Sequence, residues 1–283
     1  MQQMHDFSTT VVSCFIQIYE TEPYDFKTAE WRIEQFRKVA RIGVPICLYG
    51  CSRTMPALLN LQTEFAANVK VFDIEEYDYT RGVIWRHCLS REYTLPPQRN
   101  IAKDTAKYMA LMNSKIEFVA HSAKKNWWIT PSFAWLDFSA AYMFDDDSYC
   151  DGDDDGDDDC SIRSLKRLCI LGKERNHLYI PGCWTRNNRL TNNSATILQK
   201  ICWRFCGTFF VGDAETILLF YKKYIYYLPL FLEMENTLVW ETNFWAWLEY
   251  ICGDVGDIKF CWYSANHDSS LFMRYFDVHN YNT

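Results

Sequence analysis

Two spacings of hydrophobic residues alternate along the chain, one typical of β-strands and the other of α-helices. Short runs rich in β-branched and aromatic side chains recur between polar stretches, as in TTVVSCFIQI (9–18) and FAWLD (133–137). Runs of this length and composition are typical of strands in a buried sheet. The same pattern predicts further strands at residues 44–50, 68–74, 177–184, 204–213 and 258–264.

Helical spacing separates these runs. One helix is predicted after the first strand, with an apolar face made by Ala29, Ile33, Phe36 and Ala40. A longer helix is predicted over residues 100–122, with an apolar face made by Met109, Met112, Ile116 and Val119. We expect one more helix to begin after a cap at Asp213, and another to end at Gly253.

Strands that alternate with helices predict an α/β protein, with a mixed, mostly parallel sheet flanked by helices. The chain has 283 residues, of which 49% are hydrophobic, so it can bury a large core. We expect a single domain over residues 1–283. Its first half, residues 9–122, has the pattern of a nucleotide-binding α/β unit.

An acidic run, DDDSYCDGDDDGDDDC (145–160), interrupts this pattern. The formal net charge is −7, and without the ten aspartates of the run it would be −7 + 10 = +3, so we expect no nucleic-acid partner. Residues 151–156 match the start of an EF-hand loop, but the twelfth position is Ile162 instead of a glutamate. We therefore expect a flexible acidic insert, with a role only for Asp145–Asp147, as part of a lid.

Twelve cysteines accompany an N-terminus without the pattern of a signal peptide, so we expect reduced thiols and a cytoplasmic protein. The pairs Cys47/Cys51 and Cys202/Cys206 have spacings that are poor for zinc, which favours buried free thiols. The most apolar stretch, residues 217–232, contains two lysines and a proline. We expect no membrane span, and the oligomeric state stays open.

Asp137 is the first candidate for chemistry. It follows a predicted buried strand, and ligands of open α/β sheets gather at the carboxyl ends of strands. Together with the hydroxyl of Ser139, its carboxylate could hold Mg²⁺ or Mn²⁺ while phosphates and water complete the shell. Alternatively, Asp137 caps a turn or pairs with a basic side chain.

Four segments resemble the HtrL/YibB-type proteins of bacterial glycan gene clusters. They are TTVVSCFIQI (9–18), YMALMNSKIEFVAHSA (108–123), FAWLDFSAAY (133–142) and CGTFFVGDAETILLFYKKY (206–224). The resemblance spans residues 9–255. It implies a glycosyltransferase of GT-A type, which is a single α/β domain that binds a nucleotide sugar through a divalent metal. Residues 9–122 would then form the nucleotide-binding half, and residues 123–283 the metal and acceptor half.

The resemblance also assigns roles to single residues. Asp137-Phe138-Ser139 would be a degenerate form of the Asp-x-Asp metal motif, which lacks the second carboxylate. His267 could supply a further metal ligand, although a histidine in a polar turn can also simply be solvated. Gly207 and Gly212 resemble the small residues that let backbone approach the sugar, and could equally form a bulge and a turn.

Glu241 resembles the acidic position that faces the donor sugar, which would make it the catalytic base or the acid that binds the acceptor. It could instead be a carboxylate that stabilises the start of a helix. The diphosphate of a UDP- or GDP-linked donor needs cations. Lys115, at the lysine position of the family, is the main candidate, with Arg53 and Lys107 as further candidates and a solvated surface lysine as the alternative.

These residues predict a glycosyltransferase that moves a sugar from a nucleotide sugar to a glycan acceptor. Two other functions stay open. One is another metal-dependent enzyme that acts on a phosphorylated substrate, and the other is an inactive carbohydrate-binding or scaffold protein. The missing second carboxylate at Ser139 keeps the last of these open.

Overall fold

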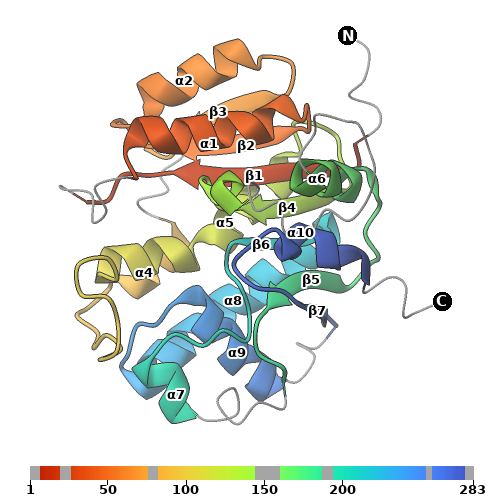
Figure 1. Ribbon diagram of the computed structural model, residues 1–283. Coiled ribbons are helices and arrows are strands. Elements are labelled where there is room, and N and C mark those ends of the chain that lie inside the picture. The colour runs from red at the N-terminus through yellow and green to blue at the C-terminus, as the bar shows by residue number, and fades with distance from the viewer. Residues whose placement is uncertain are drawn as a thin grey trace.

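A computed structural model describes residues 7–19, 27–75, 82–143, 160–186, 194–252 and 257–277. They form an α/β structure around a seven-stranded sheet with strand order β3-β2-β1-β4-β6-β5-β7 (Figure 1). The predicted α/β class with a mostly parallel sheet is confirmed. The strands are β1 Thr9–Phe15, β2 Ile46–Gly50, β3 Val69–Asp73, β4 Ser132–Leu136, β5 His177–Gly182, β6 Phe209–Asp213 and β7 Lys259–Ser264.

Only β6 runs against the other strands of this sheet. Strands β1 to β4 pair in parallel, and so do β5 and β7, whereas β6 is antiparallel to both β4 and β5. The carboxyl ends of six strands therefore lie at one edge of the sheet, together with the beginning of β6. Chain segments that leave or enter the sheet at this edge are brought close together.

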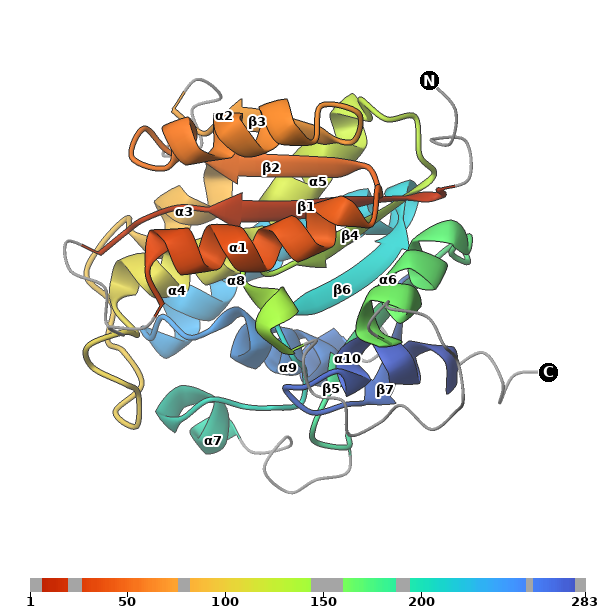
Figure 2. The ribbon, with the colours of Figure 1, turned by 45° about the horizontal axis from the view of Figure 1, so that its top comes forward.

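Helices cover both faces of the sheet. The helices are α1 Ala29–Arg41, α2 Met55–Glu64, α3 Val83–Cys88, α4 Ala106–Asn113, α5 Lys115–Lys125, α6 Cys160–Ile170, α7 Ser194–Gln199, α8 Ala214–Glu235, α9 Glu241–Cys252 and α10 Ser270–Met273, with short 3-10 helices at Ala140–Met143 and Arg274–Phe276. Helices α1, α2, α6 and α10 contribute to one apolar core, and α3, α4, α5, α8 and α9 to the other (Figure 2).

Alternation along the strands supplies both cores, because successive side chains of a strand point to opposite faces. In β1, Val11 belongs to the core of the first helix group and Val12 to that of the second. In β4, Ala134 and Trp135 divide in the same way, and all five residues of this strand are buried. The continuous hydrophobic runs of the sequence are thus explained by a sheet that is covered on both sides.

The structure corrects the predicted helix over residues 100–122, which is two helices. Helix α4 ends at Asn113 and α5 begins at Lys115, with Ser114 between them. The Asn113 side chain links α4 to the segment before α9. Its Nδ2 donates to Met109 O at 2.8 Å and to Val239 O at 2.9 Å. This tertiary contact has no signal in the helical spacing, which continues through the break.

Other details of the prediction hold. Asp213 caps α8 by accepting a hydrogen bond from Thr216 N at 2.8 Å, as expected. The first strand is shorter than predicted and ends at Phe15. Residues 145–159 of the acidic run lie outside the described residues, whereas Cys160 begins α6. In the described part of the chain, no helix is both long and apolar enough to cross a membrane.

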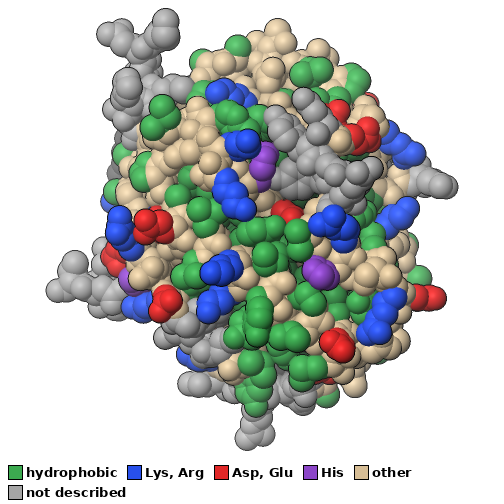
Figure 3. Space-filling view, turned by 180° about the vertical axis from the view of Figure 1, so that it is seen from behind, with side chains coloured by type: hydrophobic (Ala, Val, Ile, Leu, Met, Phe, Trp, Pro, Cys, Tyr) green, Lys and Arg blue, Asp and Glu red, His purple; other side chains and the backbone are tan. Residues whose placement is uncertain are grey.

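The face opposite to that of Figure 1 carries hydrophobic side chains in its middle and lower parts, with basic and acidic side chains interspersed around them (Figure 3). Part of the exposed apolar surface of the molecule comes from α8 and α9, through Tyr226, Leu230, Met234, Tyr250 and Ile251. On this face basic and acidic side chains are mixed.

Candidate functional site

Asp137 lies directly after β4, at the carboxyl edge of the sheet. Its backbone N–H donates to Thr208 O at 2.9 Å, which ties it to the segment that enters β6. Its Oδ1 accepts a hydrogen bond from Trp135 Nε1 at 2.8 Å and contacts Lys115 Nζ at 2.9 Å. The side chain is 36% exposed, so the carboxylate reaches solvent while Oδ1 is held in place.

Lys115, the first residue of α5, is buried at 2% exposure. Its Nζ donates to Glu241 Oε1 at 2.8 Å and to Gly207 O at 2.9 Å, in addition to its contact with Asp137. Burial alone would lower the pKa of Lys115, but the carboxylates of Asp137 and Glu241 outweigh it and raise that pKa. Lys115 is therefore a protonated bridge between two acids and not a solvated surface lysine.

Glu241 and Gly207 meet at this bridge. Glu241 is in the first turn of α9, where the helix dipole also favours a carboxylate, and only 4% of it is exposed. A Cβ atom on residue 207 would lie 2.0 Å from Glu241 Oε1. A side chain at position 207 would therefore displace the Glu241 carboxylate, which takes this space.

The bridge lies in the wall of a cavity with a volume of about 350 Å³, which we call the Asp137–Glu241 cavity. Five residues singled out in the sequence line it together, and they come from segments far apart in the chain. They are Lys115, Asp137, Gly207, Glu241 and His267. Burial lowers the pKa of His267, with the charges of Asp137 and Asp268 acting in the opposite direction.

A second cavity of about 290 Å³, the cation cavity, shares five lining residues with the first, Lys103, Tyr108, Met112, Asp137 and Thr208. Three cationic side chains line it, Lys27, Arg32 and Lys103. Burial lowers the pKa of Lys27, and the charges of Arg32 and Lys103 lower it further, because like charges near one another disfavour protonation. Such a group of cations is suited to an anionic ligand.

Ser139 also lines the cation cavity, where its Oγ accepts a hydrogen bond from Arg32 Nη1 at 3.4 Å. The sequence reasoning had selected Ser139 but missed the three cations. Lys27 and Arg32 stand at the start of the helix that follows the first strand, a position where the chain passes the ligand-binding edge of such a sheet. That signal was available in the sequence.

Arg53 and Lys107 lie apart from Asp137. They line a third cavity of about 330 Å³ at the ends of β1 and β2, which shares Ile16 and Leu111 with the cation cavity. Gly212 lies inside β6, opposite Phe133 of β4, and lines none of these three cavities. The structure therefore does not bring Gly212 together with the other predicted site residues.

The fold and the site define an α/β protein with a charged groove at the carboxyl edge of its sheet. No known protein family and no curated protein matches the chain, so the resemblance to HtrL/YibB-type proteins stays a prediction. Sixteen chains of solved structures match it, and two of them, both at low identity, serve as examples. Mouse xyloside xylosyltransferase 1 in its apo form has 10% identity, with 90% of this chain and 84% of that chain covered and a TM-score of 0.46.

The second structure is 4-diphosphocytidyl-2C-methyl-D-erythritol synthase from Anaerococcus prevotii. It has 8% identity to this chain and a TM-score of 0.45, with 99% of this chain and 97% of that chain covered.

Proposed function

We propose that this protein is a glycosyltransferase of GT-A type that moves a sugar from a UDP- or GDP-linked donor to a glycan acceptor. The observation that carries the proposal is the arrangement of acids and cations around two joined cavities. Asp137 and Lys103 line both cavities, with Glu241 in one and Lys27 and Arg32 in the other. In a bound nucleotide sugar, the diphosphate would contact the cations, and the reacting carbon of the sugar would face the acid Glu241.

The metal of such an enzyme would be Mn²⁺ or Mg²⁺, held by Asp137. The residues fit this role: Oδ1 is fixed by Trp135 and Lys115, the side chain is 36% exposed, and one or two protein carboxylates suffice when phosphates complete the shell. Ser139 lines the same cavity. When bound, the metal would offset the negative charge that develops on the departing diphosphate.

Glu241 would accept the proton of the acceptor hydroxyl in an inverting reaction. Its Oε1 accepts from Lys115, and among the described residues Oε2 makes no such contact, so Oε2 is the oxygen that would take the proton. The acceptor oxygen then bonds to the sugar carbon, and the bond from that carbon to the phosphate breaks. Lys115, through its hydrogen bond to Oε1, orients the carboxylate of Glu241 for this step.

Thermal unfolding with UDP-, GDP-, TDP- and CMP-linked compounds, with and without Mn²⁺, tests the proposal. A donor at about 100 times its Kd stabilises a protein by roughly 2.7 kcal/mol, which is a clear shift in Tm. We expect a UDP- or GDP-linked donor with Mn²⁺ to raise Tm, and Asp137→Ala to lose the part of the shift that depends on the metal.

Asp73→Ala is the matched control, because Asp73 ends β3 at the same edge of the sheet but lines neither the Asp137–Glu241 cavity nor the cation cavity. This variant should keep the full shift. If no nucleotide stabilises the protein, the transferase proposal is overturned. A metal-dependent shift in Tm that persists in Asp137→Ala would show that the metal binds at another site.

One observation favours a second candidate, a carbohydrate-binding protein without activity. Lys115 already neutralises charge on both Asp137 and Glu241, and no second carboxylate follows Asp137 at position 139. A transfer and hydrolysis assay with the donor found above separates the two. Tight donor binding without turnover, in the wild type and with a range of glycan acceptors, would favour the binding protein.

A further inference from the structure

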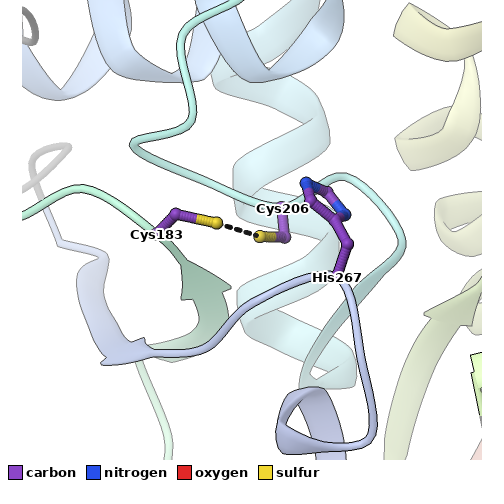
Figure 4. A group of neighbouring side chains, drawn as sticks. All are labelled: Cys183, Cys206 and His267. Atoms are coloured by element: carbon purple, nitrogen blue, oxygen red, sulfur yellow. Dashed lines mark hydrogen bonds between the residues drawn. The ribbon is translucent and has the colours of Figure 1, made fainter.

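Two cysteines and a histidine from three separate segments converge beside the Asp137–Glu241 cavity (Figure 4). Cys183 follows β5, Cys206 precedes β6 and His267 follows β7, so all three lie at the carboxyl edge of the sheet. One ligand atom from each lies within 4.8 Å of the other two, and the two sulfur atoms are 3.7 Å apart.

The separation of the sulfurs distinguishes between two arrangements. A disulfide would bring them to about 2.05 Å, so the pair at 3.7 Å is not bonded. Two thiolates on a tetrahedral zinc, each at about 2.3 Å from the metal, lie about 3.8 Å apart. The observed distance therefore matches the separation of two thiolate ligands on one zinc ion.

The backbone around the three residues is fixed by hydrogen bonds between their segments. Cys183 N donates to Trp203 O at 2.9 Å, and Cys206 N donates to Pro181 O at 2.7 Å. Ala265 N, at the end of β7, donates to Gly182 O at 3.0 Å. The three segments are thus tied to one another through main-chain groups.

A glycine keeps this crossing tight. A Cβ atom on residue 182 would lie 1.9 Å from the carbonyl oxygen of Arg204, so only glycine lets the two segments cross here. The guanidinium of Arg204 is in turn held by Glu249 through two hydrogen bonds of 2.7 Å. The cluster stands on a rigid scaffold, as a metal site requires.

We propose that Cys183, Cys206 and His267 bind a zinc ion beside the Asp137–Glu241 cavity, whose wall includes His267. Thiolate and imidazole ligands select zinc over Mg²⁺ and Mn²⁺, which prefer oxygen, so this ion is distinct from the one expected at Asp137. Three protein ligands leave one position for water or a ligand group. The Trp203 ring packs edge to face against the imidazole of His267, with 4.3 Å between the ring centroids, and holds it in place.

This assignment changes the role of His267. The family resemblance implies that His267 is a further ligand of the metal at Asp137. In the structure, however, its imidazole lies close to the sulfur atoms of Cys183 and Cys206. The fixed spacings Cys47/Cys51 and Cys202/Cys206 gave no sign of the cluster, because its two cysteines come from either side of α7. Only the pairing of β5, β6 and β7 brings them together.

The test measures metal content and metal affinity of the full chain under a phosphine reductant. We expect about one zinc per chain by mass spectrometry of the metal, and a thiolate-to-cobalt charge-transfer band when Co²⁺ replaces zinc. Cys183→Ser and His267→Ala should each weaken zinc binding by roughly tenfold or more, since loss of even an outer-shell partner costs 10- to 100-fold.

Cys202→Ala is the matched control, because Cys202 is a buried free thiol on the same segment as Cys206 but outside the cluster. It should keep both the zinc and the cobalt band. Cys183 is only partly buried, so Cys183→Ser is the variant expected to fold, and circular dichroism checks that it does.

A folded wild-type protein without zinc and without the cobalt band would overturn the proposal, and so would a Cys183→Ser variant that binds zinc as the wild type does. Neither measurement needs a nucleotide. The zinc site can therefore fail while the transferase proposal stands, and the reverse also holds.

Discussion

A single ammonium group holds the candidate site together. Lys115 Nζ contacts Asp137 Oδ1, Glu241 Oε1 and Gly207 O, all within 2.9 Å. Removing one partner of a buried ion pair leaves an uncompensated charge, which costs far more than the pair itself contributes. Lys115 therefore matters most because it holds the carboxylates of Asp137 and Glu241 side by side in the wall of the Asp137–Glu241 cavity.

We predict that Lys115→Met lowers the free energy of unfolding by about 3–5 kcal/mol, because Glu241 would be left buried without a counter-charge. Urea unfolding measures the change. Adding Glu241→Gln to Lys115→Met removes the stranded charge and should restore part of the loss. Equal stability of wild type and Lys115→Met would show that the bridge is not formed in solution.

At the scale of elements, the junction of α4 and α5 sets the direction from which Lys115 enters the site. Asn113 is 1% exposed and uses both ends of its amide: Nδ2 donates to Met109 O and Val239 O, and Oδ1 accepts from Tyr224 OH at 2.6 Å. Val239 lies just before Glu241. One side chain thus ties α4, α8 and the segment that leads into α9.

Asn113→Ala should destabilise the protein by about 1–3 kcal/mol for each buried group left unsatisfied, chiefly Tyr224 OH and Val239 O. Chemical denaturation gives the value. Asn60→Ala serves as the control, because Asn60 is an exposed asparagine in helix α2 and its loss should change stability by no more than about 0.5 kcal/mol. A similar small effect at position 113 would contradict the tie.

At the scale of the whole molecule, pH acts on the core through His121. Its Nδ1 is 2.8 Å from Tyr49 OH, and burial lowers its pKa from 6.5 to about 4, with the charges of Lys125 and Lys124 adding to the effect. Between these two pH values the unfolded chain binds a proton that the folded chain does not. Stability contributed by the neutral imidazole is therefore lost as pH falls from 6.5 towards 4.

We expect His121→Gln to flatten the dependence of unfolding free energy on pH in that window, because glutamine does not titrate. Denaturation at several pH values between 4 and 7 measures the slope. Asn60→Ala, which removes no titratable group, is the control and should keep the slope of the wild type. Identical slopes for wild type and His121→Gln would contradict the assignment.

Sequence periodicity predicted the strands and the class of fold because strand burial leaves a local pattern, as in β4. It also predicted that Asp137 leaves the sheet at its carboxyl edge. It could not predict that Lys115 bridges Asp137 and Glu241, or that Cys183 meets Cys206, because those contacts join distant segments. Periodicity within one segment carries no information on which other segment packs against it.

The position of β7 at the edge of the sheet has a consequence for how the protein is made. Lys115 and Asp137 leave the ribosome before β6 exists, and His267 follows only after β7, so no early fragment contains the groove. Contacts of such long sequence separation form slowly, because closing the loop between them costs entropy before the contact is made. The groove is therefore complete only after β7 has joined the sheet as its edge strand. Binding of a ligand in the groove thus shows that the whole sheet has formed.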